Sequence, residues 1–531
     1  MKIGKKSRSF SSQNHLVLAV LGLLLVLGTL LLTDSSTRFW TNLDSRFSFN
    51  SPNIGELPTL VVDMPFENYD QLLDQRAEAL ESAVFIAEDS DFLNGDIRFG
   101  EATIPVQLRL KQGVAKHLGE DDKWNFELHT RRDEQLLDMS HFFLIDPADH
   151  DWVNEWAFMA ALLREGIIAP HYQFVRLIFN GDDRGIYALQ EGFGFELIHA
   201  QSSQEGVIVG FDMTKLWESI GHMGGEAAAQ ANPISNLTAD SFELFGIDTL
   251  YAVDQEDEQN AAIELLSSLQ DGSLPAREIF DIERMGMFLA LADLWGAADG
   301  TQLTNLRFFY NPRSERLEPI GFNGSPKLND DAQRISVTAM YGDAQIQAAY
   351  VEAAERLSQP EYLERLRADL ESEWEVQAGL VSSEVSLTPP WEALSGRQQL
   401  LNRSLNPIEP VLANLGPESL SMEGIIEVDV TNIVNLPIEL VGFDINGELF
   451  LPADPIWWVN RPASYQAGAI ILPTFSAANN ESISAPQSAT FQIPLAAIIT
   501  QNEEIDFNQQ VTISVVTKLV GQENTVLTEA R

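Results

Sequence analysis

The hydrophobic pattern of this chain changes character near Pro407, and this change restricts the possible folds more than any other feature. Before it, apolar residues recur with the period of strands and with the period of helices. After it, short apolar stretches alternate with Asn, Pro, Gly and Ser. These stretches are residues 425–426, 438–441, 470–472 and 511–516. The pattern predicts an α+β domain followed by a C-terminal all-β, Ig-like sandwich over residues 406–531.

Strand patterns begin early in the globular part. Apolar and polar residues alternate over residues 104–110 and again over residues 124–128, and each run predicts a half-buried strand. Further along, two apolar runs flank the dipeptide Asn180-Gly181. This dipeptide is typical of a tight β-hairpin turn, so we expect a hairpin there.

Helix patterns occur between the strands. Large apolar residues recur at helical spacing over residues 152–163. Asp281 precedes an apolar run and can cap a helix over residues 282–295. Ser358 and Glu361 have the spacing of a capping box, which predicts the start of a further helix.

The N-terminal region contains an apolar run without charges at residues 16–33. At 1.5 Å per residue this run can cross the hydrocarbon of a bilayer, so it predicts a transmembrane signal anchor. The basic tail, residues 1–15, is expected in the cytoplasm, and residues 34–59 form a polar stalk. The predicted location is the cell membrane, with a single pass and an extracytoplasmic body. A cleaved signal peptide is the alternative, but the run ends without the small-residue exit of a cleavage site.

The charge balance is strongly acidic, with 78 acidic residues against 33 basic ones and a net charge of −45. Such a chain repels phosphate backbones, which argues against nucleic acid as a partner. A basic partner, a calcium-rich exterior or plain solubility each fit this charge. The chain has no cysteine, which excludes disulfides, thiol catalysis and zinc sites that use cysteine.

Two blocks carry ordered motifs, in residues 104–197 and in residues 305–324. The first block contains Arg109-Leu110-Lys111-Gln112-Gly113, Asp122-Lys123-Trp124-Asn125-Phe126 and Gly185-Ile186-Tyr187-Ala188-Leu189-Gln190-Glu191. The second block reads NLRFFYNPRSERLEPIGFNG. In this order the motifs resemble the CotH kinase family, the spore-coat-CotH-like proteins, and especially its members with an Arg-Leu-Lys-Gly motif.

The resemblance implies an atypical protein-kinase-like (CotH-like) domain over residues 60–405. Some family members are described as kinases that use ATP to phosphorylate surface or coat proteins. ATP and Mg²⁺ are therefore the expected cofactors if the chain is active, and none is expected otherwise. Phosphoryl transfer itself requires positioning and charge neutralisation more than covalent chemistry.

Four residues are candidates for binding the nucleotide. Arg109, Lys111 and Lys123 could place positive charge near the phosphates, and the first two share one strand face. Glu191 could pair with a lysine, as a kinase glutamate does. Solvated strand charges are the alternative interpretation of the three cations, and a surface carboxylate is the alternative for Glu191.

Asp299 and Asn305 resemble the family's Asp and Asn before the aromatic strand, which makes them the catalytic candidates. Asp299 could orient an acceptor hydroxyl, and Asn305 could bind a metal together with Asn323. An ordinary cap and turn is the alternative, because the segment around Asp299 is turn-like.

The chain departs from the family pattern where charge matters most. Kinase-competent relatives have an Asp-x-Asp pair where this chain has Gly321 and Asn323. A neutral amide holds a divalent cation less well than a carboxylate. Glu127 and His129 also stand where many relatives have basic residues. ATP is moreover scarce outside the cytoplasm.

These departures predict a membrane-anchored, CotH-like scaffold, or pseudokinase, with weak or absent kinase activity. Its predicted role is binding of envelope or surface proteins. Two alternatives remain open: an active atypical kinase that phosphorylates exported or envelope proteins with ATP and Mg²⁺, and a purely structural envelope protein.

Four histidines, at positions 117, 129, 141 and 150, lie close together in the sequence. None of them pairs with another at the spacing that metal ligands have on one helix or turn. The sequence therefore does not predict a zinc site.

Overall fold

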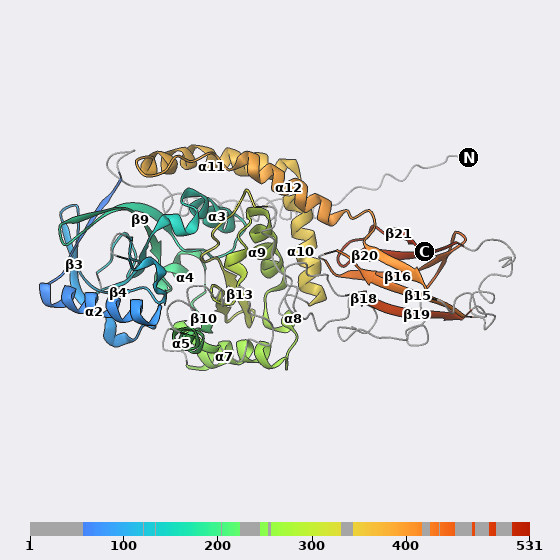
Figure 1. Ribbon diagram of the computed structural model, residues 1–531, viewed down its shortest axis with the longest axis horizontal. Helices are drawn as coiled ribbons and strands as arrows, with labels where there is room; N and C mark the ends of the chain where they lie inside the picture. The colour runs from blue at the N-terminus through green and yellow to red at the C-terminus, as the bar shows by residue number, and fades with distance from the viewer. Residues whose placement is uncertain are drawn as a thin grey trace, which may run out of the picture. The chain divides into compact units, whose positions relative to one another are not determined.

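The computed structural model describes most of the chain from residue 57 onward. The described residues are 57–119, 122–132, 134–202, 204–223, 245–252, 256–330, 343–416, 425–434, 436–451, 470–472, 488–494 and 512–531. Leu57–Arg531 form one compact unit. In Figure 1 its first strands are blue, the central sheet and helices are green to yellow, and the last strands are orange to red.

A closed barrel of seven strands forms the first part of the described chain, in the order β1-β3-β4-β6-β7-β9-β8. Neighbouring strands are antiparallel except β1 and β8, whose parallel pairing closes the barrel. The strands are β1 (Thr59–Asp63), β3 (Leu93–Phe99), β4 (Ala102–Leu110), β6 (Phe126–Thr130), β7 (His141–Ile145), β8 (Tyr172–Phe179) and β9 (Asp182–Glu191). Closure removes the exposed edges that an open sheet would present to solvent.

Side-chain alternation separates the barrel interior from its outer face. On β4, Ile104, Val106, Leu108 and Leu110 are buried, while the residues between them are only half-buried. Each such fully buried side chain stabilises the fold by about 1.5–3 kcal/mol. The two predicted strands at 104–110 and 124–128 thus correspond to β4 and β6, which pair directly.

The predicted hairpin is confirmed between β8 and β9. Asn180 and Gly181 both have positive φ, at 48° and 90°. Two consecutive residues with positive φ match the right-handed twist of the flanking strands. The Asn180 side chain also accepts a hydrogen bond from the Met64 N–H at 2.7 Å, which ties the turn to the end of β1.

A four-stranded sheet of order β11-β10-β12-β13 follows the barrel. Its strands are β10 (Val207–Asp212), β11 (Gly246–Tyr251), β12 (Arg307–Asn311) and β13 (Arg316–Ile320). The longer helices are α2 (Phe66–Ser82), α3 (Val153–Arg164), α5 (Thr214–Met223), α7 (Glu256–Asp271), α9 (Ile282–Trp295), α10 (Ala344–Leu357), α11 (Pro360–Val381) and α12 (Trp391–Leu405). The short elements are β2 (Val84–Phe85), β5 (Gly113–Val114), α4 (Phe195–Gln201), α8 (Ala276–Ile279), η1 (Asp89–Asp91), η2 (Ala115–His117), η3 (Pro147–His150) and η5 (Ala298–Thr301).

Of the two predicted helix caps, the one at Asp281 is confirmed and the one at Ser358 is wrong. Asp281 caps α9 as expected, because its side chain accepts the Arg284 N–H at 3.0 Å. The capping box at Ser358 is wrong, since Ser358 is the C-cap of α10 and its hydroxyl donates to the Glu355 carbonyl at 2.9 Å. Helix α11 begins instead at Pro360, whose fixed φ suits the first helical position.

The C-terminal region contains two antiparallel sheets among the described residues. One has the order β14-β15-β19, and the other has the order β17-β16-β20-β21 with β18 paired to β16. The strands are β14 (Val411–Leu415), β15 (Ile425–Asn432), β16 (Ile438–Ile445), β17 (Glu448–Phe450), β18 (Ile470–Leu472), β19 (Ser488–Pro494), β20 (Ile513–Leu519) and β21 (Val526–Glu529). Phe443 of one sheet and Phe491 of the other pack with ring centroids 5.5 Å apart.

The fold class expected from the sequence is wrong. The sequence led to an α+β, kinase-like domain followed by an Ig-like sandwich, with an N-terminal transmembrane helix. The structure is a mixed α/β fold with a closed barrel and several separate sheets. The barrel could not be foreseen because its closing pair joins residues 59–62 to residues 176–179, and no local pattern specifies a pairing across that distance.

The predicted signal anchor at residues 16–33 lies outside the described residues. Within the described part of the chain, no helix is long and apolar enough to cross a membrane. Even α11, with 22 residues, carries acidic and basic side chains along its length. The single-pass membrane location expected from the sequence thus finds no support in the described residues.

Two helical glycines differ in their surroundings. Gly286 of α9 lies against the backbone of α10, whereas Gly396 of α12 faces open space. A Cβ at Gly286 of α9 would lie 2.5 Å from the Ala349 carbonyl carbon of α10, whereas a Cβ at Gly396 of α12 would meet nothing within 4 Å. We expect Gly286→Ala to lower the free energy of unfolding by about 1–3 kcal/mol through overpacking. The matched Gly396→Ala should raise it by up to about 1 kcal/mol, because alanine favours the helix. Urea unfolding of both variants checks this; equal effects would contradict the close approach.

Candidate functional site

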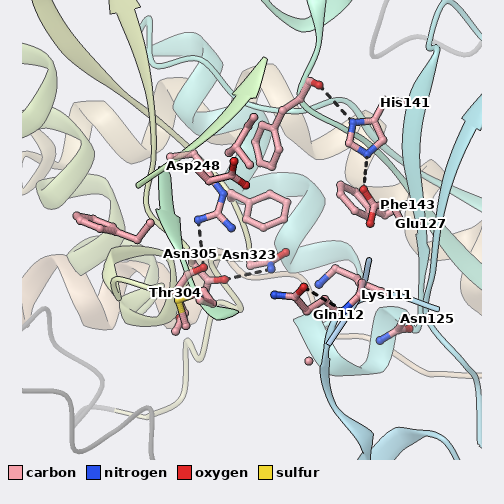
Figure 2. Close-up of a pocket in the computed structure, with 18 of the residues that line it drawn as sticks. Lys111, Gln112, Asn125, Glu127, His141, Phe143, Asp248, Thr304, Asn305 and Asn323 are labelled. Atoms are coloured by element: carbon pink, nitrogen blue, oxygen red, sulfur yellow. Dashed lines mark hydrogen bonds and ion pairs between the residues drawn. The ribbon is translucent and has the colours of Figure 1, made fainter. Parts of the chain in front are cut away.

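A pocket of about 1220 Å³ lies beside the outer face of the barrel (Figure 2). The barrel strands β4, β6 and β7 supply one group of lining residues. Strands β10, β11 and β12, η5 and the loop after β13 supply another. The pocket therefore collects side chains from segments that are far apart in the sequence.

Five of the predicted site residues line this pocket: Arg109, Lys111, Asp299, Asn305 and Asn323. The structure thus brings together the phosphate-binding candidates of the barrel and the catalytic candidates near η5. Arg109 lies on β4 and Lys111 is the first residue after this strand, so their two-residue spacing brings both to the pocket side.

Lys123 and Glu191 are not among the residues that line the pocket. The Lys123 ammonium forms an ion pair with Glu384 at 2.6 Å and donates to the Ile186 carbonyl at 2.8 Å. The Glu191 carboxyl is buried and accepts the His171 N–H at 3.0 Å. Both residues therefore support the barrel wall and do not face the pocket.

Arg109 is held by a carboxylate on the neighbouring strand. Its Nε and Nη2 donate to Glu127 Oε2 at 3.0 and 2.9 Å, across the β4–β6 pair. Burial opposes ionisation of Glu127, but hydrogen bonds with His129 and His141 and the charge of Arg109 hold its pKa well below the usual range. The Arg109 charge is thus largely neutralised before any ligand arrives.

Lys111 differs from Arg109 in its surroundings. Among the described residues its ammonium has no ion-pair partner within 4.0 Å, and it lies 5.8 Å from the Phe143 ring centroid. Burial lowers the pKa of Lys111, and the charge of Arg307 adds to this while Glu127 opposes it. Figure 2 shows its side chain directed into the pocket. Lys111 is the pocket cation best placed to meet an anion.

The catalytic candidates form a chain of hydrogen bonds near η5. Asn323 Nδ2 donates to Asn305 Oδ1 at 3.2 Å, and Asn305 Nδ2 donates to the Asp299 carbonyl at 3.0 Å. The Asp299 carboxylate accepts from Gln302 at 3.0 Å and lies 3.4 Å from the Lys327 ammonium. Its negative charge is therefore already paired.

These residues fit Mg²⁺ poorly. Mg²⁺ prefers carboxylate oxygens in octahedral geometry. Asn305 Oδ1 already accepts a hydrogen bond, and Asp299 faces Lys327. Asn323 Oδ1 is buried and has no hydrogen-bond partner among the described residues, but it carries no net charge. Asp299, Asn305 and Asn323 therefore do not form a magnesium site in this arrangement.

The loop that carries Asn323 is fixed by a buried glutamate of α3. Glu155 accepts the Gly324 N–H at 3.0 Å and the Ser325 N–H at 2.8 Å. Burial raises the pKa of Glu155 to about 8, although both N–H groups oppose the shift. The carboxyl group holds the loop against α3 and so sets the position of the Asn323 amide.

Gly321 faces away from the pocket. A Cβ at this position would collide with Leu162 of α3, and Gly321 is absent from the residues that line the pocket. Of these two positions, only Asn323 therefore faces the pocket, and a carboxylate at position 321 would not reach it. The sequence alone treated the two positions as equivalent.

Sequence reasoning missed Arg307, which lines the pocket from β12. Its guanidinium lies 5.6 and 5.5 Å from the ring centroids of Phe193 and Phe322. Its Nη1 donates to the Thr304 and Leu306 carbonyls, while its buried Nε has no hydrogen-bond partner among the described residues. Burial lowers the pKa of Arg307 to about 10, so it remains charged. The aromatic strand at 307–310 was the signal that could have pointed to it.

The sequence also gave no reason to group His129 with His141. They lie directly opposite each other on β6 and β7, with ring centroids 4.1 Å apart. Glu127, two residues before His129, lies on the same face and completes a cluster of three possible metal ligands. Pairing the two apolar strands on either side of the 131–140 connection would have revealed this arrangement.

No protein-family model matches this chain, and no curated protein matches it either.

The raised pKa of Glu155 predicts a pH dependence of stability. An unfolded glutamate has a pKa near 4.5, so between about pH 4.5 and 8 the folded state holds a proton that the unfolded state releases. The free energy of unfolding should therefore fall as pH rises, by at most about 1.4 kcal/mol per pH unit from this group. Glu155→Gln cannot titrate and should remove that slope.

Urea unfolding at pH 5, 6, 7 and 8 checks this as the difference between wild type and Glu155→Gln. The difference isolates Glu155 from other groups such as His150, whose pKa burial lowers to about 3. Glu371→Gln, at a side chain 40% exposed, is the control and should keep the wild-type slope. A difference that does not vary with pH would contradict the raised pKa.

Proposed function

We propose that the chain is a ligand-binding scaffold of the pseudokinase kind, with motifs resembling the CotH family. Its pocket binds a phosphate-bearing anion and transfers phosphate weakly or not at all. The observation that carries this proposal is the contrast, among the described residues of one pocket, between an unpaired lysine and a paired carboxylate. Lys111 lacks an ion pair among the described residues, while the Asp299 carboxylate, on the residue whose backbone carbonyl accepts from Asn305, faces Lys327.

Anion binding is supported by the cations that line the pocket. Lys111 and Arg307 are both buried enough for their pKa values to fall, so each has lost part of its hydration. An anion that meets such groups restores favourable interactions for charges already removed from water, and charge-assisted hydrogen bonds are the stronger kind. A phosphate supplies several acceptor oxygens for these donors.

The nearby amides suit a ligand that also carries a donor. Asn323 Oδ1 is buried and lacks a hydrogen-bond partner among the described residues. Leaving such an acceptor unsatisfied costs about 1–3 kcal/mol, and a ligand hydroxyl or amino group would recover that cost. The favoured ligand class is therefore a phosphate ester with a hydroxyl or amino group, such as a nucleotide.

Weak transfer is supported by the missing carboxylates. Catalysis of phosphoryl transfer depends on metal ions that bridge the phosphates and neutralise developing charge. With Asp299 paired and Asn323 neutral, the pocket binds such a metal weakly. The active-kinase alternative keeps one supporting observation: Asp299 lines the same pocket as Lys111, where it could orient a hydroxyl if Lys327 moved.

Replacing Lys111 tests the anion-binding proposal. We expect Lys111→Met to weaken ATP or pyrophosphate binding at least tenfold, because a charge-assisted hydrogen bond is worth about 1.5–3 kcal/mol. Isothermal titration calorimetry with and without MgCl₂ measures the affinity. Lys215→Met, at an exposed lysine outside the pocket lining, is the matched control and should bind normally. Binding that is lost without Mg²⁺, or equal in both variants, would contradict the proposal.

Restoring a carboxylate tests why the pocket lacks metal-dependent chemistry. Asn323→Asp places a carboxylate beside Asn305 Oδ1, at a position only 7% exposed. We expect this variant to gain a rise of several degrees in melting temperature on addition of about 10 mM MgCl₂, because a carboxylate attracts the ion. The wild type and the exposed control Asn402→Asp should show no such rise. A magnesium effect already present in the wild type would count against the proposed inactivity.

A further inference from the structure

Three side chains on the outer face of β6 and β7 converge on one point. Glu127 Oε1 lies 3.1 Å from His141 Nε2 and 3.8 Å from His129 Nε2. The imidazole rings are stacked, with planes 13° apart. Antiparallel pairing produces the cluster, since His129 lies opposite His141 and Glu127 is two residues away on the same face. All three residues line the pocket, and Figure 2 labels Glu127 and His141 there.

If the His141 ring is neutral, its Nε2 and the Glu127 carboxylate oxygen are both hydrogen-bond acceptors and face each other. Its Nδ1 lies 3.2 Å from the Phe193 carbonyl oxygen, which can only accept, so Nδ1 carries a proton. In the neutral ring Nε2 then presents a lone pair to Glu127 Oε1, which is also an acceptor. A cation must lie between them, either a second proton on the ring or a metal ion.

The separations match those between ligands of a tetrahedral metal. Bonds of about 2.0–2.1 Å to nitrogen and oxygen place neighbouring ligand atoms about 3.4 Å apart. The two separations, 3.1 and 3.8 Å, lie on either side of that value. The two imidazoles are stacked with planes 13° apart, so both rings must turn toward a common point to seat an ion.

The groups around the ligands hold them in the required orientation. The Phe193 carbonyl fixes the His141 tautomer that leaves Nε2 free, an arrangement typical of metal-binding histidines. Arg109 donates two hydrogen bonds to Glu127 Oε2 and leaves Oε1 directed at the histidines. The Arg109 charge weakens the attraction for a second cation but also immobilises the carboxylate.

We propose that Glu127, His129 and His141 form a site for a divalent transition-metal ion, with Zn²⁺ as the expected ion. Two imidazoles and one carboxylate are the ligand set that zinc takes in sites with an open position, and the chain offers no cysteine to compete. The open position faces the pocket, where water or an oxygen of a pocket ligand completes the coordination. This site is distinct from the Asn305–Asn323 region and does not depend on the proposed anion binding.

Metal titration of the full chain tests the proposal. The protein is purified with a tag that contains no histidine, stripped with a chelator, and titrated with Zn²⁺ by calorimetry and with Co²⁺ by visible absorption. We expect one ion per chain in both titrations, and visible Co²⁺ bands typical of tetrahedral nitrogen and oxygen ligands. These readouts require no enzymatic activity.

Variants assign the bound ion to the cluster. His129→Ala removes a side chain that is 40% exposed and should be tolerated by the fold, and it should weaken Zn²⁺ binding at least tenfold. Glu127→Gln keeps the side-chain shape and should weaken binding to a similar extent. His199→Ala, at an exposed histidine stacked on Phe195 outside the pocket lining, is the control and should bind as the wild type does.

Two results would overturn the site. A wild type that binds no Zn²⁺ at a one-to-one ratio would mean that a proton, and not a metal, lies between His141 and Glu127. Binding that persists unchanged in both His129→Ala and Glu127→Gln would place the ion elsewhere on the chain.

Discussion

The parallel pairing of β1 with β8 closes the barrel, and closure decides which side chains can reach the pocket. In a closed sheet one set of alternating residues must fill the interior, so the other set is forced outward. On β4 and β6 the apolar set faces inward. Arg109 and Glu127 consequently lie together on the outside, beside Lys111 at the end of β4.

Some charged side chains of the pocket form ion pairs with an opposite charge, and others form none among the described residues. Arg109 is neutralised by Glu127, and Asp299 by Lys327, so neither is fully available to a ligand. Lys111 and Arg307 retain charges that burial has partly stripped of water. Acidic side chains such as Asp149, Asp212 and Asp248 also line the pocket, so favourable charge for an anion is confined to the immediate surroundings of these two cations.

The two places in the pocket where a cation could bind differ in the ligand atoms that they offer. Near η5 the available oxygens are amides that already hydrogen-bond to one another, which suits a neutral or donor group. On β6 and β7 two imidazoles and a carboxylate face a common point, which suits a borderline metal. The loop that carries Asn323 is held by Glu155, so the position of the Asn323 amide depends on a carboxyl group that does not line the pocket.

The sequence by itself determined the local elements whose signals are local. The strand alternation at 104–110, the Asn180-Gly181 turn and the Asp281 cap each depend on residues a few positions apart, and the structure contains all three. The capping box at Ser358 failed because Pro360 offers a stronger helix start two residues later. Motif order also placed Arg109, Lys111, Asp299, Asn305 and Asn323 among the candidates, and these line one pocket.

Only the tertiary structure decided the barrel, the partners of each charge and the histidine cluster. Barrel closure pairs strands more than a hundred residues apart, and Lys123 meets Glu384 from a distant helix end. His129 and His141 become neighbours through strand register, which a shift of one residue would reverse. Sequence patterns specify which face a residue occupies, whereas the fold alone specifies what that face meets.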